Sequence, residues 1–267
     1  MKRKLGINAE FSNRLTSLEA LDYIAAAGFD STFTLECDTE KVRALKERAN
    51  ELGLEFDILH APFDGINAMW TQPEGEPPIL TKMKSAVSAA ADNGIGTVII
   101  HISGGWYPPA INDLGLSRFD GLVAYAKERG VKLAFENLMT LGNVAYFVDH
   151  YRDSDNVGFC FDAGHEHCNT KTVSWLDIFC ERTVATHIHD NFSRGDEKVG
   201  GIDLHRLPFD GTYDYEKMVA RLDKYGYTGS LMLEVFMFRS EEYERMTVEE
   251  FLALAHSRAV KLSNFSA

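Results

Sequence analysis

Six short apolar segments of the chain each end in a side chain that can bind a metal ion. These side chains are His60, His101, Glu136, Asp162, His189 and Glu234. Three carboxylates gathered in a partly buried place would lose hydration, which costs on the order of several kcal/mol for each uncompensated charge. A divalent cation removes that penalty. The nitrogen and oxygen donors of Glu136, Asp162, His189 and Glu234 therefore predict a site for Mn²⁺, Co²⁺, Zn²⁺ or Mg²⁺.

Other polar residues lie close to these ends in the sequence. His165 follows the aspartate of the fourth segment by three residues, so it should return to the same place. Asp203 and His205 lie in a long segment after His189 and are additional candidate ligands of a metal or a substrate. His187 shares a strand face with His189, because side chains alternate along a strand, and we expect it to orient a ligand.

Aromatic and glycine residues follow the same segments. Phe63 and Trp70 come after the run that ends in the first histidine, Gly104-Gly105-Trp106-Tyr107 comes after the next run, and Glu36 ends an earlier one. Glycine admits close backbone approach, and aromatic faces pack against sugar C–H groups or nucleobases. Phe63, Trp106 and Glu36 are therefore candidate substrate contacts, with loop packing or solvent exposure as the alternative.

Eight runs rich in β-branched or aromatic residues predict strands, because they are too short for buried helices. They are Lys4–Asn8, Ser31–Leu35, Phe56–His60, Thr97–His101, Lys132–Glu136, Val157–Asp162, Val184–His189 and Ser230–Glu234. Helical periodicity predicts helices between them, at Ser17–Ala27, Glu40–Leu52, Leu80–Asn93, Leu116–Arg129 and Tyr215–Tyr225, with Ser17 as the first cap. Five glycines follow these helices and predict their C-caps: Gly28, Gly53, Gly94, Gly130 and Gly226.

The strict alternation predicts a parallel sheet with crossover helices, and eight such units in 267 residues match one (β/α)₈ barrel domain, residues 1–267. A doubly wound open sheet is the main competitor, but the chain has no glycine-rich dinucleotide or phosphate motif. The carboxyl ends of barrel strands converge on one mouth, where active sites lie. The six metal-binding side chains should therefore meet there, beside two long connections at residues 61–78 and 190–214.

The composition limits the classes of function. Apolar residues make up 45% and charged residues 25% of the chain, and 27 basic against 40 acidic residues give a net charge of −13, which argues against sequence-blind binding to nucleic acid. No apolar run reaches the ~20 residues of a membrane helix, and the N-terminus has no signal-peptide core. Four cysteines without a C-x-x-C pair predict reduced thiols. We expect a cytoplasmic protein without membrane partners; a homo-oligomer stays open.

Taken in order, several stretches resemble the xylose isomerase-like TIM barrel superfamily, which includes the sugar phosphate isomerases and epimerases and endonuclease IV. These stretches are His60–Phe63, Ile99–His101, Ala134–Asn137, Cys160–His165, His187–Asn191, Asp203–His205 with Pro208–Gly211, Gly226–Gly229 and Leu233–Glu234. The ordered set is specific, whereas any single stretch is not. The resemblance implies a single TIM barrel domain.

The resemblance also implies roles for the metal-binding residues. In the isomerase and epimerase members, the positions of Glu136, Asp162, His189 and Glu234 hold one divalent metal, and the two glutamates act as acid and base. The position of His165 contacts substrate oxygens in those members. In endonuclease IV these four positions and those of His60, His101, His165, Asp203 and His205 hold three zinc ions. This chain has an acceptable ligand at all nine positions.

Departures from the nuclease pattern favour a sugar enzyme. Phe63 stands where endonuclease IV has a tyrosine, Gly164 where it has a cysteine, and Asp190-Asn191-Phe192 replaces Asn-Asp-Ser. The stretch Glu36–Glu40 is acidic where a DNA-inserting loop would be basic or polar. With the net charge, these departures favour a small polyol-like substrate over DNA.

We therefore expect a metal-dependent sugar, sugar phosphate or polyol-like isomerase or epimerase that transfers a proton through a metal-stabilised enediolate. Glu136 and Glu234 are the expected catalytic residues. A single ion is the expectation, with Asp203 and His205 contacting substrate or tying down their loop. The alternative is an endonuclease IV-like zinc phosphodiesterase that cleaves DNA at abasic sites. A barrel without activity would lose a central ligand, and none is lost.

Overall fold

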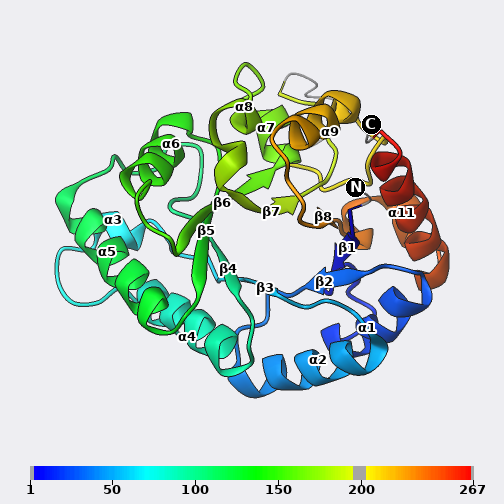
Figure 1. Ribbon diagram of the computed structural model, residues 1–267, viewed down its shortest axis with the longest axis horizontal. Helices are drawn as coiled ribbons and strands as arrows, with labels where there is room; N and C mark the ends of the chain where they lie inside the picture. The colour runs from blue at the N-terminus through cyan, green and yellow to red at the C-terminus, as the bar shows by residue number, and fades with distance from the viewer. Residues whose placement is uncertain (1–2, 195–202, 266–267) are drawn as a thin grey trace.

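Eight parallel strands alternate with helices around a ring in the computed structural model, which describes residues 3–194 and 203–265 (Figure 1). The strands are β1 (Leu5–Asn8), β2 (Ser31–Phe33), β3 (Ile58–His60), β4 (Thr97–Ile100), β5 (Lys132–Glu136), β6 (Val157–Asp162), β7 (Thr183–His187) and β8 (Leu231–Leu233). Seven longer helices are α1 (Ser17–Ala26), α2 (Thr39–Leu52), α4 (Pro78–Asp92), α5 (Asp113–Glu128), α6 (Leu141–His150), α9 (Tyr215–Lys224) and α11 (Val248–Ser263). Short helices lie in the connections: α3 (Ala68–Thr71), α7 (Ala163–Asn169), α8 (Trp175–Phe179) and α10 (Glu241–Glu244). The predicted single (β/α)₈ barrel is confirmed.

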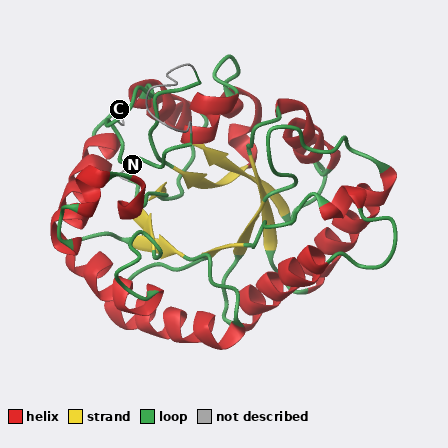
Figure 2. Ribbon diagram, turned by 180° about the vertical axis from the view of Figure 1, so that it is seen from behind, coloured by secondary structure: helices red, strands yellow, loops and turns green. Residues whose placement is uncertain are grey.

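The strands pair in two parallel sheets that together form the barrel wall. One sheet has the order β2-β1-β8, and the other has the order β3-β4-β5-β6-β7. Isolated bridges join the two sheets, from Thr34 to Leu59 on one side and from Ile188 to Leu233 on the other. Figure 2 shows the strands at the centre with the helices packed outside them. All the strands run in the same direction, so their carboxyl ends share one mouth.

The ends of the helices follow local chemistry in the sequence. α1 begins after Thr16, whose hydroxyl accepts from the Glu19 amide while the Glu19 carboxylate accepts from the Thr16 amide, a complete capping box. The prediction of Ser17 as the cap is therefore wrong by one residue, because only the pair spaced three apart satisfies both amides. The five predicted C-terminal glycines all have positive φ, as Gly53 does at 73° after α2.

Strand boundaries differ from the sequence prediction by one or two residues at both ends of the barrel. β5 and β6 have the predicted bounds, whereas β2 ends at Phe33 and β8 ends at Leu233. β7 begins at Thr183 and ends at His187, so His189 lies two residues beyond the strand. The predicted strand was too long there because the pairing of β7 with β6 ends at His187. The next backbone amide, of Ile188, donates to the Met232 carbonyl of β8 instead.

Apolar packing fixes the barrel below the mouth. Small inward residues, Ile99, Ala134, Cys160 and Ala185, fill the inside of the five-stranded sheet. Trp70, which follows the first histidine run in the sequence, is buried against Gly115 of α5, where an added Cβ would lie 2.0 Å from the indole ring.

All four cysteines are free thiols. Among the described residues, no helix is long and apolar enough to cross a membrane.

Candidate metal centre

Three carboxylates and one histidine meet at the mouth of the barrel. Glu136 ends β5, Asp162 ends β6, His187 ends β7 and Glu234 follows β8, and one ligand atom from each lies within 4.8 Å of the others. His187 Nδ1 is 3.0 Å from Glu136 Oε1, 3.5 Å from Glu234 Oε2 and 4.0 Å from Asp162 Oδ2. We call these four residues the carboxylate group.

His187, which the sequence analysis expected to orient a ligand, lies among the three carboxylates, and His189, the predicted ligand, contacts Asp162 with Nε2 at 3.2 Å. β7 ends at His187, so this side chain points into the barrel with the last inward residues of its neighbours. The ring of Phe33 stacks on it at 4.8 Å, which fixes the plane of the imidazole. A pattern of alternate residues leaves His187 and His189 equivalent, and only the end of the strand distinguishes them.

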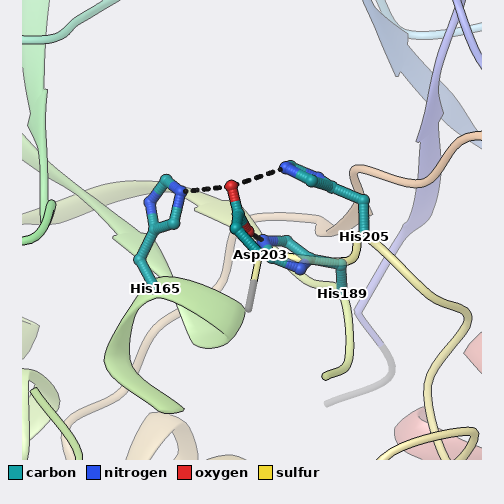
Figure 3. Close-up of side chains that lie close together, drawn as sticks. All are labelled: His165, His189, Asp203 and His205. Atoms are coloured by element: carbon teal, nitrogen blue, oxygen red, sulfur yellow. Dashed lines mark hydrogen bonds and ion pairs between the residues drawn. The ribbon is translucent and has the colours of Figure 1, made fainter. Parts of the chain in front are cut away.

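His189 belongs to a second cluster, with His165, Asp203 and His205, which we call the histidine group (Figure 3). Asp203 Oδ2 lies 3.5 Å from His165 Nε2 and 3.2 Å from His205 Nε2. The rings of His189 and His205 stack at 3.9 Å. The buried atoms His189 Nδ1 and Asp203 Oδ1 have no hydrogen-bond partner among the described residues. Such orphaned ligand atoms fit a site that takes a further polar or metal partner.

The histidine group depends on local backbone that a strand pattern does not contain. A Cβ at Gly164 would lie 1.9 Å from His189 Cε1, so only glycine leaves space for this ring. His205 has a left-handed backbone with φ of 46°. Its side chain reaches back to the Glu234 carbonyl, which lies 3.0 Å from Nδ1. The two groups meet where His189 Nε2 lies 3.2 Å from the Asp162 carboxylate.

A third set of ligands shares Glu136 with the carboxylate group. His101 Nε2 is 2.8 Å and His60 Nε2 is 3.3 Å from Glu136 Oε2, and the three residues form a group that could hold an ion. The structure thus brings together all nine residues that the sequence named as ligands and His187, which it named as a residue that orients a ligand. Glu136 is the point at which two of the three groups join.

Burial and charge act against each other throughout the centre. Burial alone would raise the pKa of Glu136, but the charges of His187 and His101 hold it well below its ordinary value. Burial lowers the pKa of His187, while Glu234 and Glu136 raise it, with a net rise to about 9. Burial and Asp203 oppose each other in the same way at His205, whose pKa rises to about 9. The neighbouring carboxylates thus keep the imidazoles of His187 and His205 protonated, and a divalent cation could replace those protons.

Members of all three groups line a cavity of about 350 Å³: His60, His101, Glu136, His165, Asp203, His205 and Glu234. Asp162, His187 and His189 are fully buried beside it. Phe63 lies on its wall and stacks on His101 at 4.3 Å. Trp106 and Glu36 do not line it: Trp106 is 52% exposed beneath the Arg194 guanidinium, and Glu36 pairs with Lys41. Of the three predicted substrate contacts, only Phe63 therefore faces the cavity in the structure.

One supporting residue of the centre was missed from the sequence. The amide of Asn137 is fully buried, accepts from the Asp162 backbone amide at 2.7 Å and donates to the Asp162 carbonyl at 2.8 Å. It therefore couples the ends of β5 and β6. Its position directly after Glu136 is the signal that could have identified it, because a polar residue after the last ligand of a strand has no packing role in the core.

Comparison with known proteins agrees with this geometry. The family described as xylose isomerase-like TIM barrel matches residues 21–255. The chain belongs to this family. An uncharacterized protein, y4fM of Sinorhizobium fredii, is 31% identical over 294 residues and covers 90% of this chain and 91% of its own. The inosose dehydratase of Glaesserella parasuis is 28% identical over 147 residues, 47% of this chain and 49% of its own.

Solved structures share the fold of this family member at low sequence identity. A D-tagatose 3-epimerase-like protein has a TM-score of 0.72 and 20% identity over 96% of this chain and 99% of its own. D-psicose 3-epimerase of Clostridium cellulolyticum, solved with D-tagatose, has a TM-score of 0.72 and 14% identity over 98% of both chains. The IOLI protein with a bound zinc atom has a TM-score of 0.73 and 19% identity over 98% of both chains.

Proposed function

We propose that this protein is a divalent-metal-dependent isomerase or epimerase of a small sugar or polyol-like substrate. The observation that carries the proposal is the carboxylate group, two of whose members, Glu136 and Glu234, line a cavity large enough for a small molecule. Neighbours named as sugar epimerases and a relative named inosose dehydratase support the same class of substrate. Whether the proton returns to the same or to a neighbouring carbon decides between epimerase and isomerase.

The carboxylate group fits a divalent cation. Its three carboxylates are buried and would repel one another without positive charge between them. Glu136, Asp162, His187 and Glu234 would hold the ion, with Mn²⁺, Zn²⁺, Co²⁺ and Mg²⁺ all compatible with this donor set. When bound, the ion supplies Lewis-acid stabilisation of the negative charge that develops on substrate oxygens.

Glu234 is the better placed of the two glutamates to remove a carbon-bound proton. Both Glu136 oxygens lie within 3.3 Å of imidazole nitrogens, so this carboxylate is already engaged. The nearest imidazole nitrogens to Glu234, of His187 and His205, lie 3.5 Å away. Burial raises the pKa of Glu234, but His187 and His205 lower it to a net value below the ordinary one. Glu234 is therefore ionised and can accept a proton.

Other residues that line the cavity can bind the substrate and exclude water. His101 and His165 line it and can steady substrate oxygens. Phe63, Leu138 and Phe236 provide apolar surface that limits the access of water to a reacting carbanion. Glu136, whose strand lies across the mouth from Glu234, would return the proton to the other face in an epimerisation.

Proton exchange with solvent tests the proposal directly. The purified protein would be loaded with Mn²⁺ or Co²⁺ and incubated in D₂O with a panel of ketoses, and NMR would follow deuterium entry at the carbon next to the carbonyl. We expect deuterium incorporation with at least one ketose, its loss in chelator and its recovery when the metal is restored. Full activity after thorough chelation would contradict the metal requirement.

The endonuclease alternative is supported by one observation, the three neighbouring ligand groups, two of which share Glu136. A duplex with a single abasic site distinguishes it from the isomerase. We expect no cleavage and no binding with a steep salt dependence, since the chain carries a net charge of −13. Cleavage together with three bound ions per chain would establish the alternative.

A further inference from the structure

One polar wall residue of the cavity is not used by the metal groups and has an orphaned atom. Asn169 lines the cavity, and its side-chain oxygen is buried without a hydrogen-bond partner among the described residues. Nor does its amide nitrogen have a hydrogen bond within the described chain. A buried polar atom without a partner is costly, so the arrangement suits a partner that comes from outside the protein.

Helix α7 places Asn169 next to the metal centre. The helix begins after Asp162, whose carboxylate accepts from the His165 amide at 2.6 Å. Asn169 follows His165 by four residues, so both side chains occupy the same face of the helix. Asn169 and His165 line the same cavity as the metal ligands, so a substrate in that cavity can reach Asn169.

The chemistry of the amide selects among substrate groups. A primary amide offers one acceptor and two donors, and a hydroxyl can both donate to the oxygen and accept from the nitrogen. A phosphate dianion or a carbonyl has no proton to donate to the orphaned oxygen. The amide is also neutral, so it adds no charge beside the four carboxylates of the centre.

We infer that Asn169 is a specificity-determining residue that binds a hydroxyl group of the substrate, at a carbon outside the reacting pair. The inference rests on the proposed function, because it places a polyol in the cavity. A site that hydrogen-bonds a hydroxyl group discriminates against analogues that lack this hydroxyl, so the enzyme should bind such analogues more weakly than the parent sugar. The residue acts on binding and takes no part in the proton transfer.

The test combines Asn169→Leu, which keeps the approximate shape of the side chain, with monodeoxy analogues of the best ketose. We expect the variant to raise KM about ten-fold, with kcat nearly unchanged. The wild type should discriminate against one monodeoxy analogue, and the variant should treat that analogue and the parent sugar alike. The control is Asn50→Leu on the exposed face of α2.

An unchanged KM, or an equal loss with every analogue, would overturn the inference while the proposed function stands. If the wild type turns over no ketose, the proposed function fails, and calorimetric binding of the same sugars to the metal-loaded wild type and variant decides about Asn169. Weaker binding by the variant alone supports the inference. Equal binding by both proteins, or binding by neither, overturns it.

Discussion

The carboxylate group and the histidine group touch each other but are built on different kinds of backbone. All four members of the first lie at or one residue beyond strands β5, β6, β7 and β8. The second has His165 on a short helix and its other members in the connection after β7. Paired strands hold side chains more precisely than loops do. We therefore expect the first group to dominate metal affinity and turnover, and the second to act mainly on substrate binding.

The largest effect should follow from removing a charge in the carboxylate group. Glu136→Gln or Glu234→Gln should lower kcat by about 10³-fold or more, because each removes a ligand and an acid–base group together. Folding should change little, which thermal unfolding of the chelated proteins can measure. The control is Glu166→Gln, since Glu166 is also buried and hydrogen-bonded but lies outside the three ligand groups. Equal losses of kcat in all three variants would contradict a special role of the carboxylate group.

The comparison is sharpest at His187 and His189, which lie two residues apart in the chain but in different groups. His187→Ala should weaken binding of the most tightly held ion by about 100-fold or more, whereas His189→Ala should weaken it by less than about ten-fold. Titration with Mn²⁺ or Zn²⁺, followed by calorimetry, measures both. A larger effect of His189→Ala would instead support the sequence assignment of His189 as the metal ligand.

Loss of the loop ligands should affect substrate more than metal. The double variant Asp203→Asn with His205→Asn should keep its metal stoichiometry and raise KM by about ten-fold to 100-fold. Metal analysis of the purified variant and steady-state kinetics provide the two readouts. Loss of about one ion per chain would show that the histidine group holds an ion of its own, and would favour the three-ion alternative.

Crowding the histidine group should produce a smaller, structural effect. Gly164→Ala places a Cβ against the His189 ring and should destabilise the protein by about 1–3 kcal/mol. The matched control is Gly121→Ala on α5, where an added Cβ meets nothing within 4 Å and should stabilise the helix by about 0.5–1 kcal/mol. Denaturant unfolding of the metal-free proteins measures both changes in the free energy of unfolding. If both variants change this free energy in the same direction, the geometry around His189 is contradicted.

The last expected effect is the pH dependence of the metal-free protein. The pKa values of His187 and His205 are raised from 6.5 to about 9, so their protonated forms stabilise the fold fully below pH 6.5. This stabilisation should be lost as the pH rises through 9, and the unfolding temperature of the chelated protein should fall over that range. Bound metal should flatten the dependence, because it replaces the protons. A chelated protein whose stability is constant from pH 6.5 to 9 would contradict this.

The sequence by itself determined the barrel. Alternating apolar runs and helical stretches specify local structure, and positive φ at glycines such as Gly53 ends the helices where the sequence indicates. It also determined that Glu136, Asp162 and Glu234 converge, because residues that end parallel strands must meet at one mouth. These features depend on periods of two and 3.6 residues, which are visible without any long-range contact.

Tertiary structure decided which candidate ligands lie together and which residues line the cavity. The end of β7 at His187 depends on the hydrogen bond from Ile188 to the next strand, and the place of His189 depends on space left by Gly164. Trp70 and Trp106 look alike in a loop sequence, yet one packs in the core and the other remains half exposed. Contacts between residues far apart in the chain set these outcomes, and a local pattern has no information about them.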